Sequence, residues 1–370
     1  MIAAFPLLAA SVSTDPRAVA AMTAAATAPW LLFGLAAGVV VDRVDRIRLM
    51  WMVDVGRALA MATMWFLVAN GHAGLATLYG VVFVLGAAET LFDSAAMALV
   101  PALVDDRSLE KANGRLFAGQ LAANQFMGPP LGALLFGLAA SFPAGLDAVT
   151  FLISAALLVG IKIDHPPHHG ERRSVGSELR EGLSWLWGQP NIRAMAIGAG
   201  VLNLAQTGAL AVLVLFATQN LGMSELGFGA LFAVSAVGAL TGSLTADRVT
   251  RSLGRRTTLM VSVTAMSLSL LAIGLVPSVA VTFAGMLIMG LVIEFWNVVA
   301  VSYRQQTTPD RLRGRIMSAY RFIAYGSYPI GALLGGWTAS AAGIPTSFVA
   351  GGIVIGGLAL YLARALGSFE

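Results

Sequence analysis

The chain has 370 residues, of which 57% are hydrophobic and 11% are charged. Soluble domains carry about 25% charged residues, so this composition excludes an ordinary water-soluble protein. The absence of cysteine excludes disulfides, thiolate metal sites and a thiol nucleophile. The net charge of +4 does not indicate nucleic-acid binding, because the basic residues lie in short segments between apolar runs and not on one soluble face.

Apolar runs long enough to cross a membrane recur along the whole sequence. A membrane helix needs about 20 apolar residues to cross about 30 Å of hydrocarbon. Eleven runs fit, at 17–41, 49–69, 74–100, 114–140, 143–163, 192–218, 226–246, 257–276, 278–303, 315–341 and 345–366. The pattern predicts an all-α membrane protein.

A shorter apolar segment, MIAAFPLLAASVSTDP, precedes these runs. Its apolar part covers about 13 residues, which is too short to cross the bilayer. It lacks the basic start of a signal peptide. We expect it to be the outer half of a first span whose beginning is missing, so the eleven runs are numbered as spans two to twelve.

Lys and Arg are divided unequally between the two sides of these spans. The side that holds Arg17 has no other Lys or Arg, while the opposite side holds twenty such residues. These twenty are Arg43, Arg46, Arg48, Arg107, Lys111, Arg115, Lys162, Arg172, Arg173, Arg180, Arg193, Arg248, Arg251, Arg255, Arg256, Arg304, Arg311, Arg313, Arg315 and Arg364. Because basic loops stay in the cytoplasm, the asymmetry predicts a multi-pass protein of the cytoplasmic membrane with both termini inside.

The sequence repeats itself at the same place in two six-span halves. DRVDRIRLM at 42–50 returns as DRVTRSLGRRTTLM at 247–260, and GALL at 132–135 returns at 331–334. We expect an N-terminal half at 1–163 with an incomplete first helix, and a C-terminal half at 192–370. The polar linker between them, 164–191, includes Leu179, Leu183 and Leu186 at helical spacing, which predicts an amphipathic helix on the cytoplasmic surface. The nearby HPPHHG fits a solvated linker better than a metal site.

The turn GVVVDRVDRIR resembles the signature that major facilitator transporters carry between their second and third spans. Asp45 replaces the usual second glycine, as in the subgroup of the enterobactin exporter and the macrolide efflux permeases. The segments AAETLFDSAAMALVPALV, LEKANGRL and GRIMSAYRFIAYGSYPIGALLGG also resemble that subgroup. The resemblance implies a major facilitator fold of 12 transmembrane helices in two six-helix halves, with the first helix truncated at the N-terminus.

The signature predicts a cytoplasmic gate. A carboxylate is disfavoured at a helix C-terminus, so Asp42 needs a partner outside its own helix. In this fold the second span lies beside the eleventh, whose N-terminus offers backbone NH groups and arginines. We assign Gly38, Asp42, Arg43, Arg46, Asp247, Arg248 and Arg315 to the gating motif. The alternative is that these charges only fix the topology.

The fifth span contains NQFMGPPLGALL, which resembles the antiporter motif of drug and metabolite exporters. Gly128, Pro129 and Gly132 match the motif, whereas Asn124 and Ala133 replace glycines. Proline removes a backbone donor and small residues let helices approach closely. The match favours export over import, although small residues are also ordinary packing residues in membrane helices.

Ionisable residues inside spans are candidates for proton coupling, because they are costly in hydrocarbon. Glu89 and Asp93 lie four apart on one helix face, and Glu294 lies in the tenth span, where Asn297 corresponds to Asp93 in the repeat. Arg321 is the expected charge partner. The alternative is a buried ion pair with Arg321 or Arg57 that only holds helices together.

Two other acidic residues are expected to be structural. Asp54 and Arg57, at i and i+3, neutralise each other locally. Asp147 lies near the outer start of the sixth span, where the helix dipole favours a carboxylate.

Aromatic residues fall on the spans that line the cavity in this fold, and they indicate a bulky, partly aromatic substrate. They are Trp30, Phe33, Phe92, Trp296, Tyr320, Tyr325 and Tyr328. No nucleotide-binding, metalloprotease or nucleophile-elbow motif is present, so an ATP-driven pump or an enzyme is not expected.

These features predict a secondary active transporter that exports a small organic compound, drug-like or siderophore-like, by alternating access and proton antiport. The expected partners are the substrate, protons and the lipid bilayer, with no cofactor, metal or nucleic acid, and the protein is expected to be a monomer. The alternative is a transport-inactive relative that acts as a sensor or scaffold.

Overall fold

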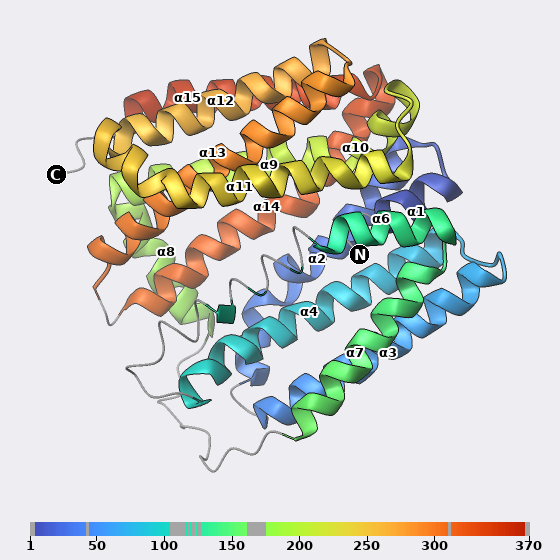
Figure 1. Ribbon diagram of the computed structural model, residues 1–370. Coiled ribbons are helices and arrows are strands. Elements are labelled where there is room, and N and C mark those ends of the chain that lie inside the picture. The colour runs from blue at the N-terminus through green and yellow to red at the C-terminus, as the bar shows by residue number, and fades with distance from the viewer. Residues whose placement is uncertain are drawn as a thin grey trace.

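The computed structural model describes residues 4–41, 44–103, 115, 116, 119, 123, 127–160, 175–309 and 312–366, and most of these residues are helical. The first half contains α1 (Ala4–Val12), α2 (Pro16–Val41), α3 (Arg46–Ala69), α4 (Leu75–Leu103), α6 (Gly128–Leu138) and α7 (Phe142–Val159). After α8 (Val175–Gly188), the second half contains α9 (Pro190–Ala211), α10 (Leu213–Leu215), η3 (Phe216–Asn220), α11 (Glu225–Leu253), α12 (Arg255–Leu275), α13 (Val279–Thr307), α14 (Arg313–Ala342) and α15 (Pro345–Ala365). Figure 1 shows the two halves as adjoining bundles.

Local signals determine where several helices begin. Asp45 accepts a 2.7 Å hydrogen bond from the Arg48 amide and so caps α3. Ser224 caps α11 in the same way, through the Gly227 amide. Gly254 separates α11 from α12 with a φ of 79°, which glycine adopts without strain. The two repeated turns therefore lead into the next helix differently. An aspartate cap begins α3, whereas a glycine with positive φ precedes α12.

The seventh span is not the continuous helix that the sequence predicts. Its α-helix ends at Ala211, and α10 and the π-helix η3 follow. The break contains neither glycine nor proline. Residues 212–217 are completely buried, so tertiary packing holds a break that helix propensity alone would not produce.

The same set of helix contacts occurs in both halves. In the first, α2 and α3 pack against α4, and α3 packs against α7; in the second, α11 and α12 pack against α13, and α12 packs against α15. Small residues permit close approach at equivalent places. A Cβ on Gly86 would collide with the backbone of Ala26, and one on Gly290 would collide with that of Ser235. The halves therefore share one helix arrangement, as a parallel repeat does.

The halves meet along α2 with α14 and along α6 with α11. The contact is tight at the end away from the charged turns. A Cβ on Gly336 of α14 would lie 2.6 Å from the Ala20 Cβ and 3.0 Å from the Pro16 carbonyl oxygen. One on Gly229 of α11 would lie 2.6 Å from the Ala133 Cβ. Glycine at both places lets the halves close at this end.

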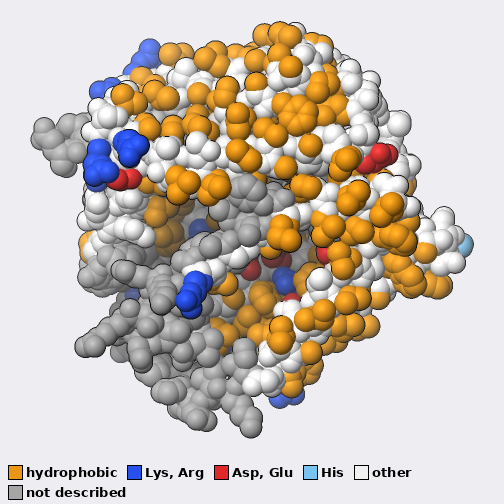
Figure 2. Space-filling view, in the orientation of Figure 1, with side chains coloured by type: hydrophobic (Ala, Val, Ile, Leu, Met, Phe, Trp, Pro, Cys, Tyr) orange, Lys and Arg blue, Asp and Glu red, His pale blue; other side chains and the backbone are white. Residues whose placement is uncertain are grey.

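Eight helices within the described ranges are long and apolar enough to cross a membrane. They are α3, the Leu75–Ala96 part of α4, α7, α9, α11, α12, α13 and α15. Their outer faces remain apolar: Leu157 is 70% exposed and Leu244 is 75% exposed. Figure 2 shows hydrophobic side chains across much of the visible surface. The fold is that of a multi-pass membrane protein.

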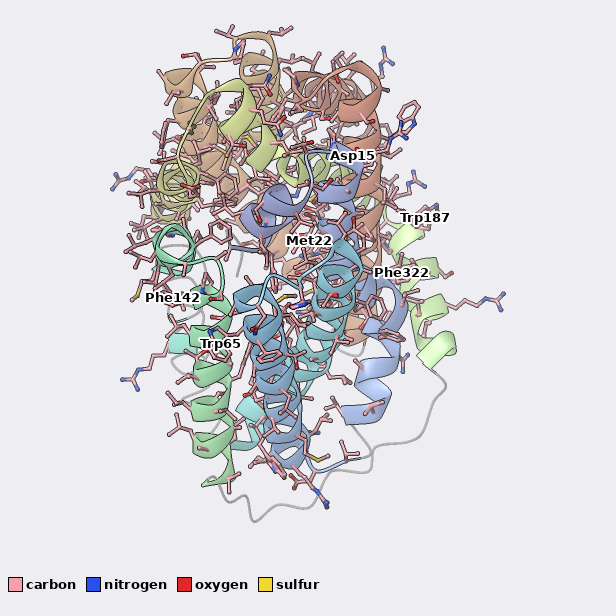
Figure 3. All side chains as sticks on the ribbon, turned by 90° about the vertical axis from the view of Figure 1, so that its right-hand side faces the viewer. Asp15, Met22, Trp65, Phe142, Trp187 and Phe322 are labelled. Atoms are coloured by element: carbon pink, nitrogen blue, oxygen red, sulfur yellow. The ribbon has the colours of Figure 1, made fainter. Side chains whose placement is uncertain are left out.

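A helix occupies the stretch between the halves in which the sequence predicts one. α8 buries Leu186 completely while Trp187 is 49% exposed, and Figure 3 places Trp187 at the edge of the bundle. α8 packs against the start of α14, where Gly182 lies directly against the backbone of Arg315.

Candidate functional site

A hollow lies between the two halves, and both acidic and basic atoms are visible inside it (Figure 2). The helices α2 and α14 meet across the interface between the halves. Charged groups inside a membrane protein are costly unless they are paired or hydrated, so this hollow is the candidate functional site.

A buried ion pair anchors the first half of the site. The Arg57 guanidinium donates to the Asp54 carboxylate over 3.3 Å, and both residues belong to α3. Ser154 of α7 donates to the other Asp54 oxygen over 2.6 Å. The guanidinium carbon of Arg57 also lies 4.9 Å from the centre of the Phe92 ring and 5.3 Å from that of Phe151. The predicted local pair of Asp54 and Arg57 is therefore present.

Arg57 does more than neutralise Asp54. It also interacts electrostatically with Glu89 and Asp93, the two carboxylates predicted for proton coupling. Asp93 in turn interacts with Arg57 and with Arg321 of α14. Asp93 therefore interacts electrostatically with a cation of its own half and with a cation of the opposite half.

The candidate carboxylate of the second half is Glu294. The Asn297 side chain, one turn further along α13, interacts with the Glu294 carboxylate. A Cβ on Gly242 of α11 would lie 3.1 Å from the Glu294 Cβ, so the glycine makes room for this side chain. Within the described residues, no three His, Asp or Glu side chains group as metal ligands would.

Aromatic rings from both halves meet where α2 packs against α14. Trp30 of α2 contacts Tyr325 of α14 edge to face, with ring centres 5.6 Å apart, and Tyr325 stacks on Tyr328 at 5.5 Å. Phe33 packs edge to face against Phe83 and is 41% exposed. These rings provide a surface on which a flat apolar compound can pack.

Two predicted cavity residues are buried in helix packing instead. Trp296 is 2% exposed because its ring fills the space above Gly198 of α9. Tyr320 is 8% exposed and lies under the Arg304 guanidinium. Neither lines an open surface here. The sequence shows which helix a residue belongs to, but not which neighbouring residue covers it.

The gating residues are only partly within the described residues. Asp42 and Arg43 lie outside them, Gly38 falls near the end of α2, and Arg46 is the first residue of α3. In the second half, Asp247 pairs with Arg251 over 2.6 Å at an exposed position, and Arg248 lies beside it on α11. Arg315 pairs with Glu181 of α8, a partner that the sequence did not suggest.

The antiporter-motif residues lie where α6 meets its neighbours. Gly128 and Pro129 begin α6, and a Cβ on Gly229 of α11 would lie 3.2 Å from the Pro129 carbonyl oxygen. A Cβ on Gly132 would meet Ala4 of α1. The motif therefore lies at a contact between the two halves.

The match to known proteins extends over nearly the whole chain. A family model described as transmembrane secretion effector matches residues 2–369. The multidrug efflux pump Tap of Mycolicibacterium fortuitum is 27% identical over 390 residues, which cover 98% of this chain and 91% of that protein. The enterobactin exporter EntS of Salmonella typhimurium is 28% identical over 294 residues, which cover 76% of this chain and 69% of that protein.

Solved transporter structures have the same arrangement of helices. A bacterial homologue of the iron transporter ferroportin, in an inward-facing state, has a TM-score of 0.74 at 16% identity, with 98% of this chain and 95% of that chain covered. The nucleoside transporter NupG has a TM-score of 0.73 at 13% identity, with 98% and 96% covered. With its repeated helix packing and the family match from residue 2 to residue 369, this chain belongs to the transmembrane secretion effector family of major facilitator efflux transporters.

Proposed function

We propose that this chain exports a small, partly aromatic organic compound across the cytoplasmic membrane by alternating access, in exchange for protons. The observation that carries the proposal is the electrostatic interaction of Asp93 with both Arg57 of its own half and Arg321 of the opposite half. A charge interaction that spans the interface can couple protonation to the relative position of the halves.

Protonation of Asp93 would remove its attraction to Arg321 and weaken the link between the halves at this depth. Glu89 lies one turn earlier and interacts with both Asp93 and Arg57, so it can exchange a proton with the same network. Glu294 is the equivalent candidate in the second half. Arg57 remains neutralised by Asp54 while Asp93 gains and loses its proton.

The direction and the substrate class have separate support. Two relatives of this chain are named as exporters, one of multiple drugs and one of enterobactin. The edge-to-face pair of Trp30 and Tyr325, which also crosses the interface, suits a compound with an aromatic ring. The gate would be the charged turn that contains Asp42, closing against the start of α14.

Transport by the full chain reconstituted in liposomes tests this proposal, with compounds first selected by an accumulation assay in an exporter-deficient host. Asp93→Asn and Glu89→Gln should abolish acceleration by a pH gradient while exchange of substrate for substrate continues. Glu225→Gln, at an exposed carboxylate that starts α11, is the matched control and should transport as the parent does. Well-folded Asp93→Asn and Glu89→Gln variants that still respond to the pH gradient would contradict the coupling role of these two carboxylates.

A further inference from the structure

A second charged site lies outside the hollow, between the cytoplasmic end of α13 and the start of α14. A small cavity of about 10 Å³ is lined by Arg304, Gln305, Thr308, Ile316 and Met317. Arg304 and Thr308 are one turn apart on the last turns of α13, whereas Ile316 and Met317 belong to the first turns of α14. The cavity therefore joins two helices at the end where the charged turns lie.

Arg304 is buried in this cavity to an unusual degree for a cation. It is 5% exposed, and its guanidinium carbon lies 3.4 Å from the centre of the Tyr320 ring. The ring face attracts the cation and the Tyr320 hydroxyl also interacts with it, but neither carries a negative charge that would neutralise the guanidinium. Buried arginines are normally paired with a carboxylate or another acceptor.

Three polar atoms at this place have no hydrogen-bond partner among the described residues. They are Nε and Nη1 of Arg304 and Oγ1 of Thr308. The two nitrogens can only donate, and the hydroxyl can donate as well. Buried donors without an acceptor are strongly unfavourable, so these three atoms imply an acceptor between them.

The size and charge of the cavity restrict what that acceptor can be. With a volume of about 10 Å³ the cavity is small, which favours a compact acceptor over a bulky organic acid. A water molecule could accept hydrogen bonds but would leave the charge of the buried guanidinium uncompensated. A monatomic anion accepts from all three donors and also neutralises that charge.

We propose that this cavity binds a single small anion of the size of chloride, held by Arg304 and Thr308. The bound anion joins the end of α13 to the start of α14 at the side on which the charged turns meet. The site is independent of the transport proposal, because its occupancy is measured through the stability of the protein and not through its activity.

Thermal unfolding of the full chain in detergent tests the site, with sodium chloride replacing sodium gluconate at constant ionic strength. The midpoint of the parent should rise with chloride and reach a plateau, because a ligand that binds only the folded state stabilises it. Arg304→Gln should lose the response. Thr308→Val, which keeps the shape of the side chain, should require at least about fivefold more chloride, as expected for the loss of one hydrogen bond.

Arg256→Gln is the matched control, because Arg256 lies at the same end of the protein but donates to the Ala363 carbonyl over 2.6 Å. It should respond to chloride as the parent does. Equal midpoints in both salts would overturn the proposal, since water or a carboxylate of the chain would then fill the cavity. An unchanged chloride response in Thr308→Val, or a weakened one in Arg256→Gln, would overturn it as well. Thr308→Val decides the question even if Arg304→Gln does not fold.

Discussion

Arg315, in the first turn of α14, forms a 2.5 Å ion pair with Glu181 of α8. The sequence assigns the same arginine to a gate in which Asp42 is the acidic partner. In this structure the halves are closed at the opposite end, where Gly336 meets Pro16 and Ala20. We therefore expect Glu181 to compete with Asp42 for Arg315 if these residues form the predicted gate.

Substitution of the two acidic partners should therefore shift the protein in opposite directions. Glu181→Gln removes the open-gate partner and should favour closure on the cytoplasmic side, whereas Asp42→Asn should favour opening. Because the Glu181 pair is partly exposed, we expect a shift of up to about fivefold for Glu181→Gln. Cross-linking between cysteines at residues 43 and 314 measures closure, since the chain has no other cysteine. Shifts in the same direction would exclude exchange of partners.

Asp247→Asn should act more weakly than Asp42→Asn, because Asp247 pairs with Arg251 at an exposed position.

Loss of the Asp54 charge should destabilise the folded protein. Asp54→Asn leaves Arg57 buried without its carboxylate in the same helix, and breaking a buried ion pair costs about 3 to 5 kcal/mol. Ser154→Ala removes only one hydrogen bond to Asp54 and should cost about 1 kcal/mol. The free energy of unfolding in detergent checks both. Equal stability of Asp54→Asn and the parent would mean that Glu89 and Asp93 alone neutralise Arg57.

The glycine at the closed end should control the opening of that end. Gly336→Val places a side chain where the Pro16 carbonyl and Ala20 leave no room, so the halves should separate there. A cysteine introduced at Val19, which is buried at 1% exposure, should react with a membrane-impermeant maleimide at least about tenfold faster in this background than in the parent. Gly357→Val on α15 is the control, because nothing lies within 4 Å of a Cβ at that glycine. Equal labelling of Val19→Cys in all three backgrounds would refute this role of Gly336.

The orientation of the chain in the membrane should follow the charge asymmetry. Cysteine at Ser177, at the start of α8, should be labelled only after the cells are permeabilised. Cysteine at His72, in the exposed turn between α3 and α4, should be labelled in intact cells. The reverse result would invert the assignment of the cytoplasmic side.

Apolar runs, charge bias and repeated motifs in the sequence determined the helical membrane fold, the repeated halves and the family. Apolar length and charge bias act on each segment separately, because the bilayer imposes the same requirements on every helix. For this reason α3, α12 and α15 lie close to their expected ranges. The sequence also predicted close helix approach at the motif that contains Gly128 and Pro129.

Only the tertiary structure decided which side chains meet. The sequence placed Glu89, Asp93 and Arg321 on their spans, but it did not show that Asp93 interacts with cations of both halves. It expected Trp296 at a cavity, whereas Gly198 of another helix receives the ring. Partners such as Glu181 for Arg315 are separated by more than a hundred residues, and no local period encodes such contacts. They depend on how the helices are rotated and packed, which the whole bundle determines through its close-packed interior.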